Sequence, residues 1–278
     1  MKNFFRNMYV IIFLLFSAIA LQGQEALPGD RIAVPFSDPS RPGVVEVSVL
    51  HGGITVKGYS GKEVIVEAQV RTREYKHKEK SSKKAEGLRR LAVNTTGLVV
   101  EEHNNVMQVE TSSHQRTIDL TIQVPTRTSL KLNCVNDGDI KAEDISGEIE
   151  VQNVNGAVTL SRISGAAIAH ALNDDVIVTF VKVDPAKPMS FSSLNGDIDV
   201  TFPADLRANI KFKAENGDIY SDFEMKMEPT TQRIEEGGKG GGKYRLRIEQ
   251  AMQGKINGGG PEINFETLNG DVYVRKGK

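Results

Sequence analysis

Residues 136–165 read NDGDIKAEDISGEIEVQNVNGAVTLSRISG, and their regularity is the strongest sign of architecture in the chain. Glycine recurs at nine-residue intervals, at Gly138, Gly147, Gly156 and Gly165. A unit of nine residues is too short to bury a core of its own, so each unit must pack its apolar side against the next. The pattern therefore predicts a repeat protein built from short, mutually dependent units.

The tripeptide Asn-Gly-Asp, followed by Ile or Val, occurs three times further along the chain. Apolar and polar residues alternate before each copy, as in Ile210, Phe212 and Ala214, and a period of two is typical of strands. Asn-Gly suits main-chain conformations with positive φ, so each copy should mark a sharp corner between two strands. The residues expected to form corners are Gly138, Gly147, Gly156, Gly165, Asn195, Gly196, Asn216, Gly217, Asn269 and Gly270.

Two arrangements fit strands that are joined by such corners. The strands can pair back on each other as hairpins, or each corner can lead into the next side of a coil whose layers stack in parallel. The nine-residue spacing favours the coil, because hairpins of a sandwich usually alternate with longer connections. We predict an all-β, single-domain β-solenoid with Asn-Gly corners and about 18 to 22 residues per coil, and keep a β-sandwich as the alternative.

The asparagines of the corners have two interpretations. Counting the alternation forward from Phe191 places Asn195 on the side of the buried residues, and Asn216 and Asn269 follow the same pattern. Stacked layers would then align these amides into a hydrogen-bonded ladder. A solvent-facing residue that only forms the turn explains them equally well, so both interpretations stay open.

The N-terminus has the order of a secretory signal peptide. Lys2 and Arg6 precede an apolar run over residues 10–21, which at about 12 residues is shorter than the roughly 20 that cross a bilayer. We expect cleavage between Ala20 and Gln24, no transmembrane segment afterwards, and an extracytoplasmic mature chain in the periplasm, on the outer surface or secreted. The expected divisions are a signal peptide at 1–24, a leader at 25–43 and the repeat domain at 44–278.

Two insertions should interrupt the repeat domain, at about 71–92 and 225–260. The second is rich in glycine but lacks the Gly-Lys-Ser/Thr ending of a phosphate loop, which favours a flexible linker around one strand. The first is strongly basic and lacks apolar periodicity, which is typical of a solvated excursion. Its functional interpretation is contact with an anionic surface such as an acidic glycan or lipid headgroups, through Arg71, Arg73, Lys76, Lys78, Lys80, Lys83 and Lys84.

Charge and cysteine content narrow the class of protein. Without Lys2 and Arg6 the 35 basic residues fall to 33 against 36 acidic ones, a net charge of −3, which argues against nucleic acid as a partner. The single cysteine, Cys134, cannot form an internal disulfide. It shares the apolar phase of Leu130 and Leu132, so we expect a small buried side chain rather than a reactive thiol.

Catalytic and metal-binding patterns are weak. The five histidines show no paired metal-ligand spacing, no Gly-x-Ser-x-Gly motif is present, and we expect no cofactor. Calcium-binding β-rolls also repeat Gly and Asp, but each corner here supplies one carboxylate, from Asp139, Asp197, Asp218 or Asp271. A polysaccharide-active β-helix enzyme is the alternative function, although the absence of Trp and the inward phase of Phe leave no aromatic platform for sugars.

Taken together, residues 120–125, residues 130–140, the stepped corners and residues 256–272 resemble the bacterial DUF4097-type adhesin family of β-strand repeat proteins. The resemblance implies an exported β-solenoid with an adhesive or envelope-associated role, and it carries over no catalytic residues. We therefore expect a noncatalytic binding or scaffold module whose partner is an unknown envelope protein or glycan. Its flat flanks should carry rows of outward residues such as Asp199 and Tyr220. The tail at 275–278 either guards the last strand against edge pairing or is an ordinary solvated tail, and both interpretations stay open.

Overall fold

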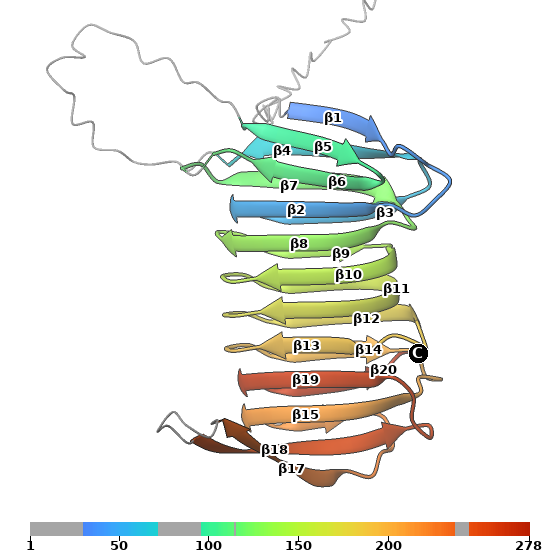
Figure 1. Cartoon of the computed structure of the whole chain (residues 1–278), viewed down its shortest axis with the longest axis vertical. Helices are drawn as coiled ribbons and strands as arrows, with labels where there is room; N and C mark the ends of the chain where they lie inside the picture. The colour runs from blue at the N-terminus through green and yellow to red at the C-terminus, as the bar shows by residue number, and fades with distance from the viewer. Residues whose placement is uncertain (1–29, 72–95, 114, 237–244) are drawn as a thin grey trace, which may run out of the picture.

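The computed structural model describes residues 30–71, 96–113, 115–236 and 245–278. Of residues 230–236 and 245–250 it describes the main chain only. The expected signal peptide and most of the basic insertion, from Arg73 to Lys84, lie outside these ranges. Every regular element within the described ranges is a strand, which confirms the all-β prediction (Figure 1). No helix capable of crossing a bilayer occurs in this part of the chain.

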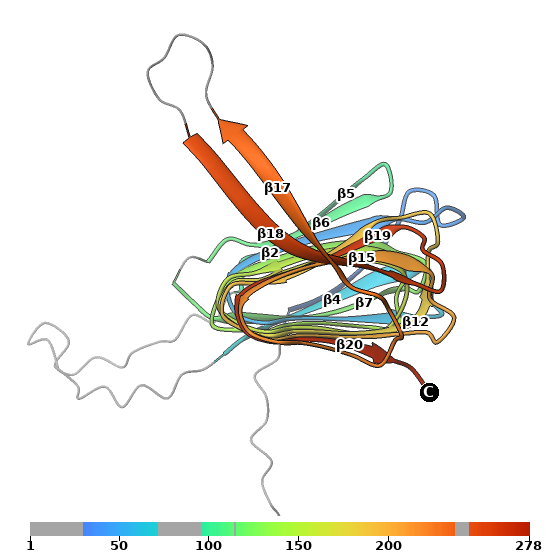
Figure 2. The ribbon, with the colours of Figure 1, turned by 90° about the horizontal axis from the view of Figure 1, so that it is seen from below.

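The strands form one mixed sheet that folds over on itself into two faces, and each layer of the stack contributes one strand to each face (Figures 1 and 2). We call them face A and face B. From the N-terminal end of the stack, face A consists of β6 (Val106–Thr111), β2 (Val44–His51), β8 (Ser129–Asn136), β10 (Ser146–Asn153), the second half of β11 (Val158–Ala171), β13 (Met189–Ser193), β19 (Glu262–Asn269) and β15 (Ala208–Asn216).

Face B follows the same order of layers. Neighbouring strands are parallel throughout this series, as they are on face A. The series consists of β7 (Ile118–Pro125), β3 (Ile54–Tyr59), β9 (Ile140–Glu143), the first half of β11, β12 (Val176–Val183), β14 (Ile198–Phe202), β20 (Val272–Lys276) and β16 (Ile219–Ser221).

The register explains the nine-residue period. Ser146 lies opposite Ser164, a spacing of 18 residues, and Val176 lies opposite Ile198, a spacing of 22. Nine residues are therefore half a layer, and successive glycines fall at alternate edges. The two strands that flank an Asn-Gly corner belong to opposite faces, so they do not pair as a hairpin.

Two layers lie out of chain order. The layer of β19 and β20 sits between that of β13 and β14 and that of β15 and β16. Likewise, the layer of β2 and β3 sits between β6–β7 and β8–β9. The expectation that every unit packs against the next along the chain is therefore wrong at both ends. The residues 225–260 supply the connection that lets the chain return and insert its last layer.

Antiparallel strands cover three of the four outer edges of the stack. They are β5 (Leu98–His103) on β6, β4 (Glu63–Val70) with β1 (Asp30–Pro35) on β7, and β18 (Arg245–Ile256) with β17 (Glu228–Glu236) on β15. β1 lies within the leader expected at 25–43. The hairpin of β17 and β18 replaces the flexible linker expected there, and Figure 2 shows it projecting from the stack.

The C-terminal tail does not guard an edge strand. It follows β20, which has β14 on one side and β16 on the other, so the tail leaves the stack beside an interior layer. The position of the inserted layer is the reason that this expectation fails. The open strand at this end is instead β16.

Inward residues of successive strands form continuous apolar columns. On face A the ring of Phe265 stacks between those of Phe191 and Phe212, with centroid distances of 5.4 and 5.2 Å. All three side chains are buried, as the alternation predicts. Burial of aromatic rings in offset stacks contributes both apolar area and ring-to-ring attraction, so this column holds the last three layers together.

Candidate functional site

The predicted corners occupy two opposite edges of the stack. Gly138, Gly156, Gly196, Gly217 and Gly270 lie on the edge that carries the Asn-Gly corners, which we call the Asn edge. Gly147 and Gly165 are paired in register within β10 and β11, at the start of the strands that leave the other edge.

Glycine is needed at these corners because the stacked main chains approach closely. A Cβ on Gly196 would lie 2.3 Å from the carbonyl oxygen of Asp174, and one on Gly138 would lie 2.4 Å from the main-chain N of Gly53. Neither Asn195 nor Gly196 has a positive φ, which Gly165 does have at 128°. The expected reason, a left-handed conformation at each Asn-Gly pair, is therefore wrong for the clean copies, and contact between layers replaces it.

The corner asparagines form an outer amide ladder. Asn195 Nδ2 donates to Asn173 Oδ1 at 3.0 Å, and Asn269 Nδ2 donates to Asn195 Oδ1 at 2.8 Å. These side chains are exposed, because the chain turns outward after Ser193 and breaks the alternation that placed them inside. The ladder runs in one direction through Asn136, Asn155, Asn173, Asn195, Asn269 and Asn216.

A second ladder, which the sequence did not reveal, lies inside the same edge. Asn153 Nδ2 donates to the carbonyl oxygen of Gly138 at 3.0 Å, and Ser193 Oγ donates to that of Asp174 at 2.9 Å. Cys134 occupies the same column, and its Sγ lies 3.0 Å from the carbonyl oxygen of Gly52. Burial raises the pKa of this thiol to about 11, which confirms Cys134 as a small buried residue.

The corner aspartates bind main chain. Asp175 Oδ1 accepts from the N–H of Asp197 at 2.8 Å, and Asp271 Oδ1 accepts from the N–H of Asp218 at 2.9 Å. Each carboxylate thus satisfies a donor of the adjacent layer, which gives a structural reason for its recurrence. Among the described residues no group of three or more His, Cys, Asp or Glu side chains is placed to hold a metal ion.

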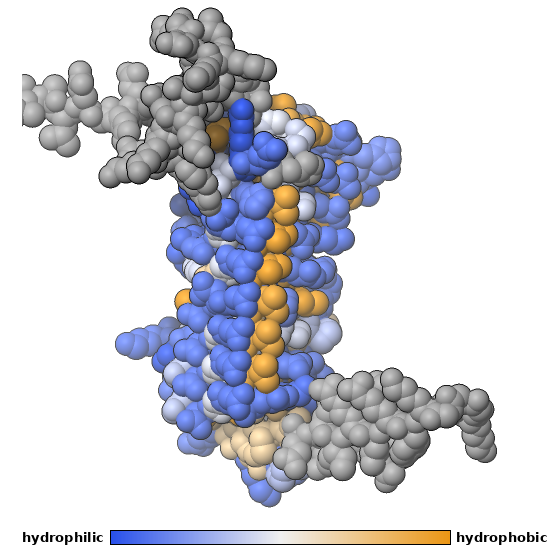
Figure 3. All heavy atoms as spheres, turned by 90° about the vertical axis from the view of Figure 1, so that its left-hand side faces the viewer, coloured by the Kyte–Doolittle hydropathy of each residue, from blue (hydrophilic) through white to orange (hydrophobic). Residues whose placement is uncertain are grey.

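An apolar stripe runs along the Asn edge, as Figure 3 shows. Its members each precede the corner asparagine or histidine, and Leu50, Val135 and Leu194 are between 36% and 38% exposed. The apolar series ends in the layer of β15, because Glu215 occupies the position before the corner asparagine there. The stripe consists of Leu50, Val135, Val154, Leu172, Leu194 and Leu268, a pattern that is visible in the sequence once the corners are aligned.

Face B carries the expected outward row of Asp199 and Tyr220, and Tyr273 lies between these two residues. Tyr273 lies opposite both Asp199 and Tyr220, so the inserted layer separates the two expected members. The rings of Tyr220 and Tyr273 stack with centroids 5.1 Å apart and planes 9° apart. Arg275 lies over the Tyr273 ring and donates from Nε to Asp199 Oδ1 at 2.8 Å. Exposed aromatic surface is therefore present, although its residues are 53 positions apart in the chain.

Arg71 is the member of the expected anionic contact set that the structure describes. Its Nε donates to Asp119 Oδ2 at 2.8 Å and its Nη1 to the carbonyl oxygen of Asp137 at 2.5 Å. Asp119 Oδ1 in turn accepts the N–H of Gly53. Arg71 thus ties β4 to the Asn edge, and these bonds occupy its guanidinium.

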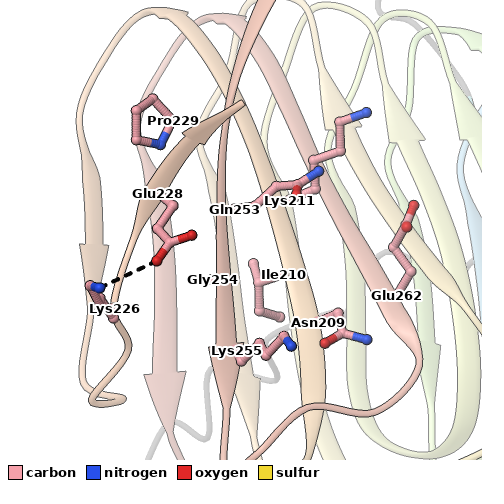
Figure 4. A pocket seen from close by; sticks show the side chains of 10 residues that line it. All are labelled: Asn209, Ile210, Lys211, Lys226, Glu228, Pro229, Gln253, Gly254, Lys255 and Glu262. Atoms are coloured by element: carbon pink, nitrogen blue, oxygen red, sulfur yellow. Dashed lines mark ion pairs between the residues drawn. The ribbon is translucent and has the colours of Figure 1, made fainter. Parts of the chain in front are cut away.

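A concave site with a volume of about 600 Å³ lies where the projecting hairpin leaves face A. Figure 4 shows side chains from β15, from the start of β17 and from β18 around it. Register places Asn209 beside Lys255 and Lys211 beside Gln253. Lys226 pairs with Glu228 at 3.3 Å, whereas Lys211 and Lys255 form no ion pair with a described residue. The site therefore offers two ammonium groups and two amides.

This donor set suits an acidic ligand. Ammonium groups attract carboxylate or sulfate groups, and amides hydrogen bond to hydroxyls. Two carboxylates, those of Glu228 and Glu262, also line the site, and that of Glu228 pairs with Lys226. Sequence reasoning missed the pocket because it treated residues 225–260 as a linker.

Comparison with known proteins gives structural similarity at low sequence identity. A chain described as a "putative cell adhesion protein" from Clostridium sporogenes is 15% identical with a TM-score of 0.47, and the match covers 90% of this chain and 100% of that one. A "putative adhesin" from Bacteroides fragilis is 11% identical with a TM-score of 0.37, covering 89% and 96%. No match was found among curated proteins.

A family model matches the part of the chain that runs from β8 to β18. Residues 128–257 match the family model described as Toastrack DUF4097. The segment begins just before β8, includes the nine-residue repeats and ends after β18. The resemblance drawn from the corners is confirmed, and residues 128–257 are a DUF4097 Toastrack domain.

Proposed function

We propose that the chain is an exported β-solenoid that serves as a noncatalytic, adhesin-like binding or scaffold module at the bacterial cell envelope. The observation that supports this most directly is the charged pocket between β15 and the β17–β18 hairpin, held on a rigid stack of hydrogen-bonded layers. A rigid support lowers the ordering cost of binding, and Lys211 and Lys255, which form no ion pair with a described residue, supply attraction. The partner is an acidic glycan or an envelope protein that presents acidic groups.

The test is retention from a cell-envelope extract on immobilised residues 25–278. The double variant Lys211→Ala/Lys255→Ala should lose the retained partner, and Lys57→Ala/Lys182→Ala, which removes two lysines elsewhere on the surface, should keep it. Equal retention by both double variants would contradict this pocket as the site. A supernatant assay for new reducing or unsaturated ends on acidic glycans covers the enzymatic alternative, and turnover there would overturn the noncatalytic proposal.

A further inference from the structure

The terminal layer of the stack ends two ladders at once, that of the corner asparagines and that of the corner aspartates. Asn216 Nδ2 donates upward to Asn269 Oδ1 at 3.0 Å, and the N–H of Asp218 donates upward to Asp271 Oδ1 at 2.9 Å. The Oδ1 atoms of the other ladder asparagines, from Asn136 to Asn269, each accept a bond from the next layer toward this end. Asn216 Oδ1 and Asp218 Oδ1 accept none from a described residue. Two directional acceptors therefore point to the position that the next layer would occupy.

The main chain of β16 is open on the same side. The carbonyl of Asp218 accepts from Val272 N, and Asp222 N donates to Val274 O, so these even-numbered residues bond toward β20. Because residues of a parallel strand alternate in the side to which they bond, the N–H and C=O groups of Ile219 and Ser221 face away from the stack. An edge of this kind is a template for another strand.

Side-chain packing is also incomplete at this layer. Ile219 is in register with the fully buried Val272 and faces the core, yet 37% of its surface is exposed. The Tyr220 ring stacks on Tyr273 on one side, and the residue is 48% exposed. On face A the same layer is covered by β18, so the exposure is confined to the β16 half.

From these observations we propose that the β16 edge, defined as Asn216, Asp218, Ile219, Tyr220 and Ser221, binds an extended strand of a partner polypeptide that presents an Asn-Gly-Asp corner. The partner strand runs parallel to β16. Its asparagine Nδ2 donates to Asn216 Oδ1, and a corner N–H donates to Asp218 Oδ1. An aliphatic residue covers Ile219, and a ring or planar group stacks on Tyr220. This pattern repeats the bonds that β20 makes to β16 from above.

The inserted layer of β19 and β20 shows that a layer can pair with layers that are not next to it in the chain. The inference deepens the proposed function, because it names a class of partner, but it uses a different surface from the charged pocket. Failure of the two proposals can therefore be told apart. Unaltered envelope binding by Lys211→Ala/Lys255→Ala, with peptide binding intact, would count against the pocket alone. Lost envelope binding in that variant, with no saturable peptide binding by the unchanged protein, would count against the edge alone.

The experiment is a fluorescence-anisotropy titration of residues 25–278, which include every described residue. The probe is a labelled peptide with the sequence of residues 266–275, ETLNGDVYVR. The comparison peptide replaces its asparagine and tyrosine by alanine. We expect the first peptide to bind saturably and the second about tenfold more weakly or worse, since it lacks the amide and the ring.

Protein variants locate the binding. Asp218→Ala, which removes the lower acceptor, should weaken binding about tenfold or more, and Ser221→Pro should do the same by removing an outward N–H. Asp205→Ala, at an exposed turn, should leave it unchanged, and circular dichroism would show that each variant is folded. Equal binding of the two peptides, or unaltered binding to Asp218→Ala, would overturn the proposal. So would sedimentation showing that the chain alone dimerises through this edge and that Asp218→Ala dissolves the dimer, since the occupant would then be a second copy.

Discussion

Asp197 Oδ1 accepts a hydrogen bond of 2.8 Å from the main-chain N–H of Asp271, although the two residues are 74 positions apart. The bond joins the Asn-Gly-Asp corner of β13 and β14 to that of the inserted layer. It makes the carboxylate of one repeat the cap of another. Two corners with the same local sequence are thus joined although they lie far apart in the chain.

Asp197→Ala should lower the free energy of unfolding by about 1–3 kcal/mol, because the N–H of Asp271 loses its charged acceptor in a partly buried corner. Urea unfolding followed by circular dichroism measures the change. Asp205→Ala, a substitution at an exposed turn, is the control and should change it by less than about 0.5 kcal/mol. Equal midpoints for the two variants would contradict the capping role.

Asn195→Ala should cost more than Asn216→Ala. Asn195 donates to Asn173 and accepts from Asn269, whereas Asn216 only donates, to Asn269. With about 0.5–1.5 kcal/mol per hydrogen bond, the interior substitution should cost about twice as much as the terminal one. Thermal unfolding of both variants tests this order, and a terminal variant that is the less stable of the two would refute it.

Gly196→Ala should destabilise the chain by about 3 kcal/mol or more, because its Cβ would lie 2.3 Å from the carbonyl oxygen of Asp174 and main chain on both sides cannot rotate away. Gly277→Ala is the matched change, since its nearest atom would be 3.2 Å away, and it should cost much less. Denaturant midpoints separate the two. A mild effect at Gly196 would show that the layers can move apart.

Tyr273 should ionise above the usual pH range of tyrosine. The hydrogen bond from its hydroxyl to Asp271 Oδ2, at 3.0 Å, favours the neutral phenol and raises its pKa, as do burial and the nearby carboxylates. Asp271→Asn removes the negative charge, so phenolate should then form at lower pH. The difference in ultraviolet absorbance between each protein and its Tyr273→Phe derivative follows this residue alone, and identical titrations would contradict the assignment.

The order of the last layers can be tested by cross-linking. Lys213 Nζ pairs with Glu266 Oε1 at 2.6 Å on face A, and Ser192 lies on the far side of Glu266. The pair Lys213→Cys/Glu266→Cys should therefore form a disulfide under mild oxidation. Ser192→Cys/Lys213→Cys should not, because two strand spacings of about 4.8 Å exceed the reach of a disulfide. Mass spectrometry distinguishes the results, and the opposite pattern would mean that the layers stack in chain order.

The sequence predicts local structure here better than the order of layers. The alternation around Phe191, Phe212 and Phe265 correctly placed all three inside, and the spacing of the glycines implied layers of 18 to 22 residues. The same regularity hides the topology. Asn195 could stack on Asn216 as well as on Asn269, since the three corners are chemically alike. Only the length and shape of the connection through β17 and β18 decide between them.

The candidate sites were harder to foresee for a related reason. The Tyr220–Tyr273 stack and the pocket of Lys211 and Lys255 join residues that become neighbours only through the inserted layer and the hairpin. The glycine runs beside β18 are typical of a linker. One strand was expected between them, but its pairing with β15 and β17 was not. The asparagine ladder could be anticipated because it follows directly from stacking identical corners, although its outward direction depends on the bend after Ser193.

The inserted position of β19 and β20 also constrains how the molecule is made. Phe265 is synthesised after both Phe191 and Phe212, and until it arrives the rings of these two residues have no partner between them. Assembly of this third of the stack cannot proceed vectorially with synthesis. A nascent chain that does not yet include residues 262–276 should remain open at this end, and deletion of these residues should remove a layer from within the stack.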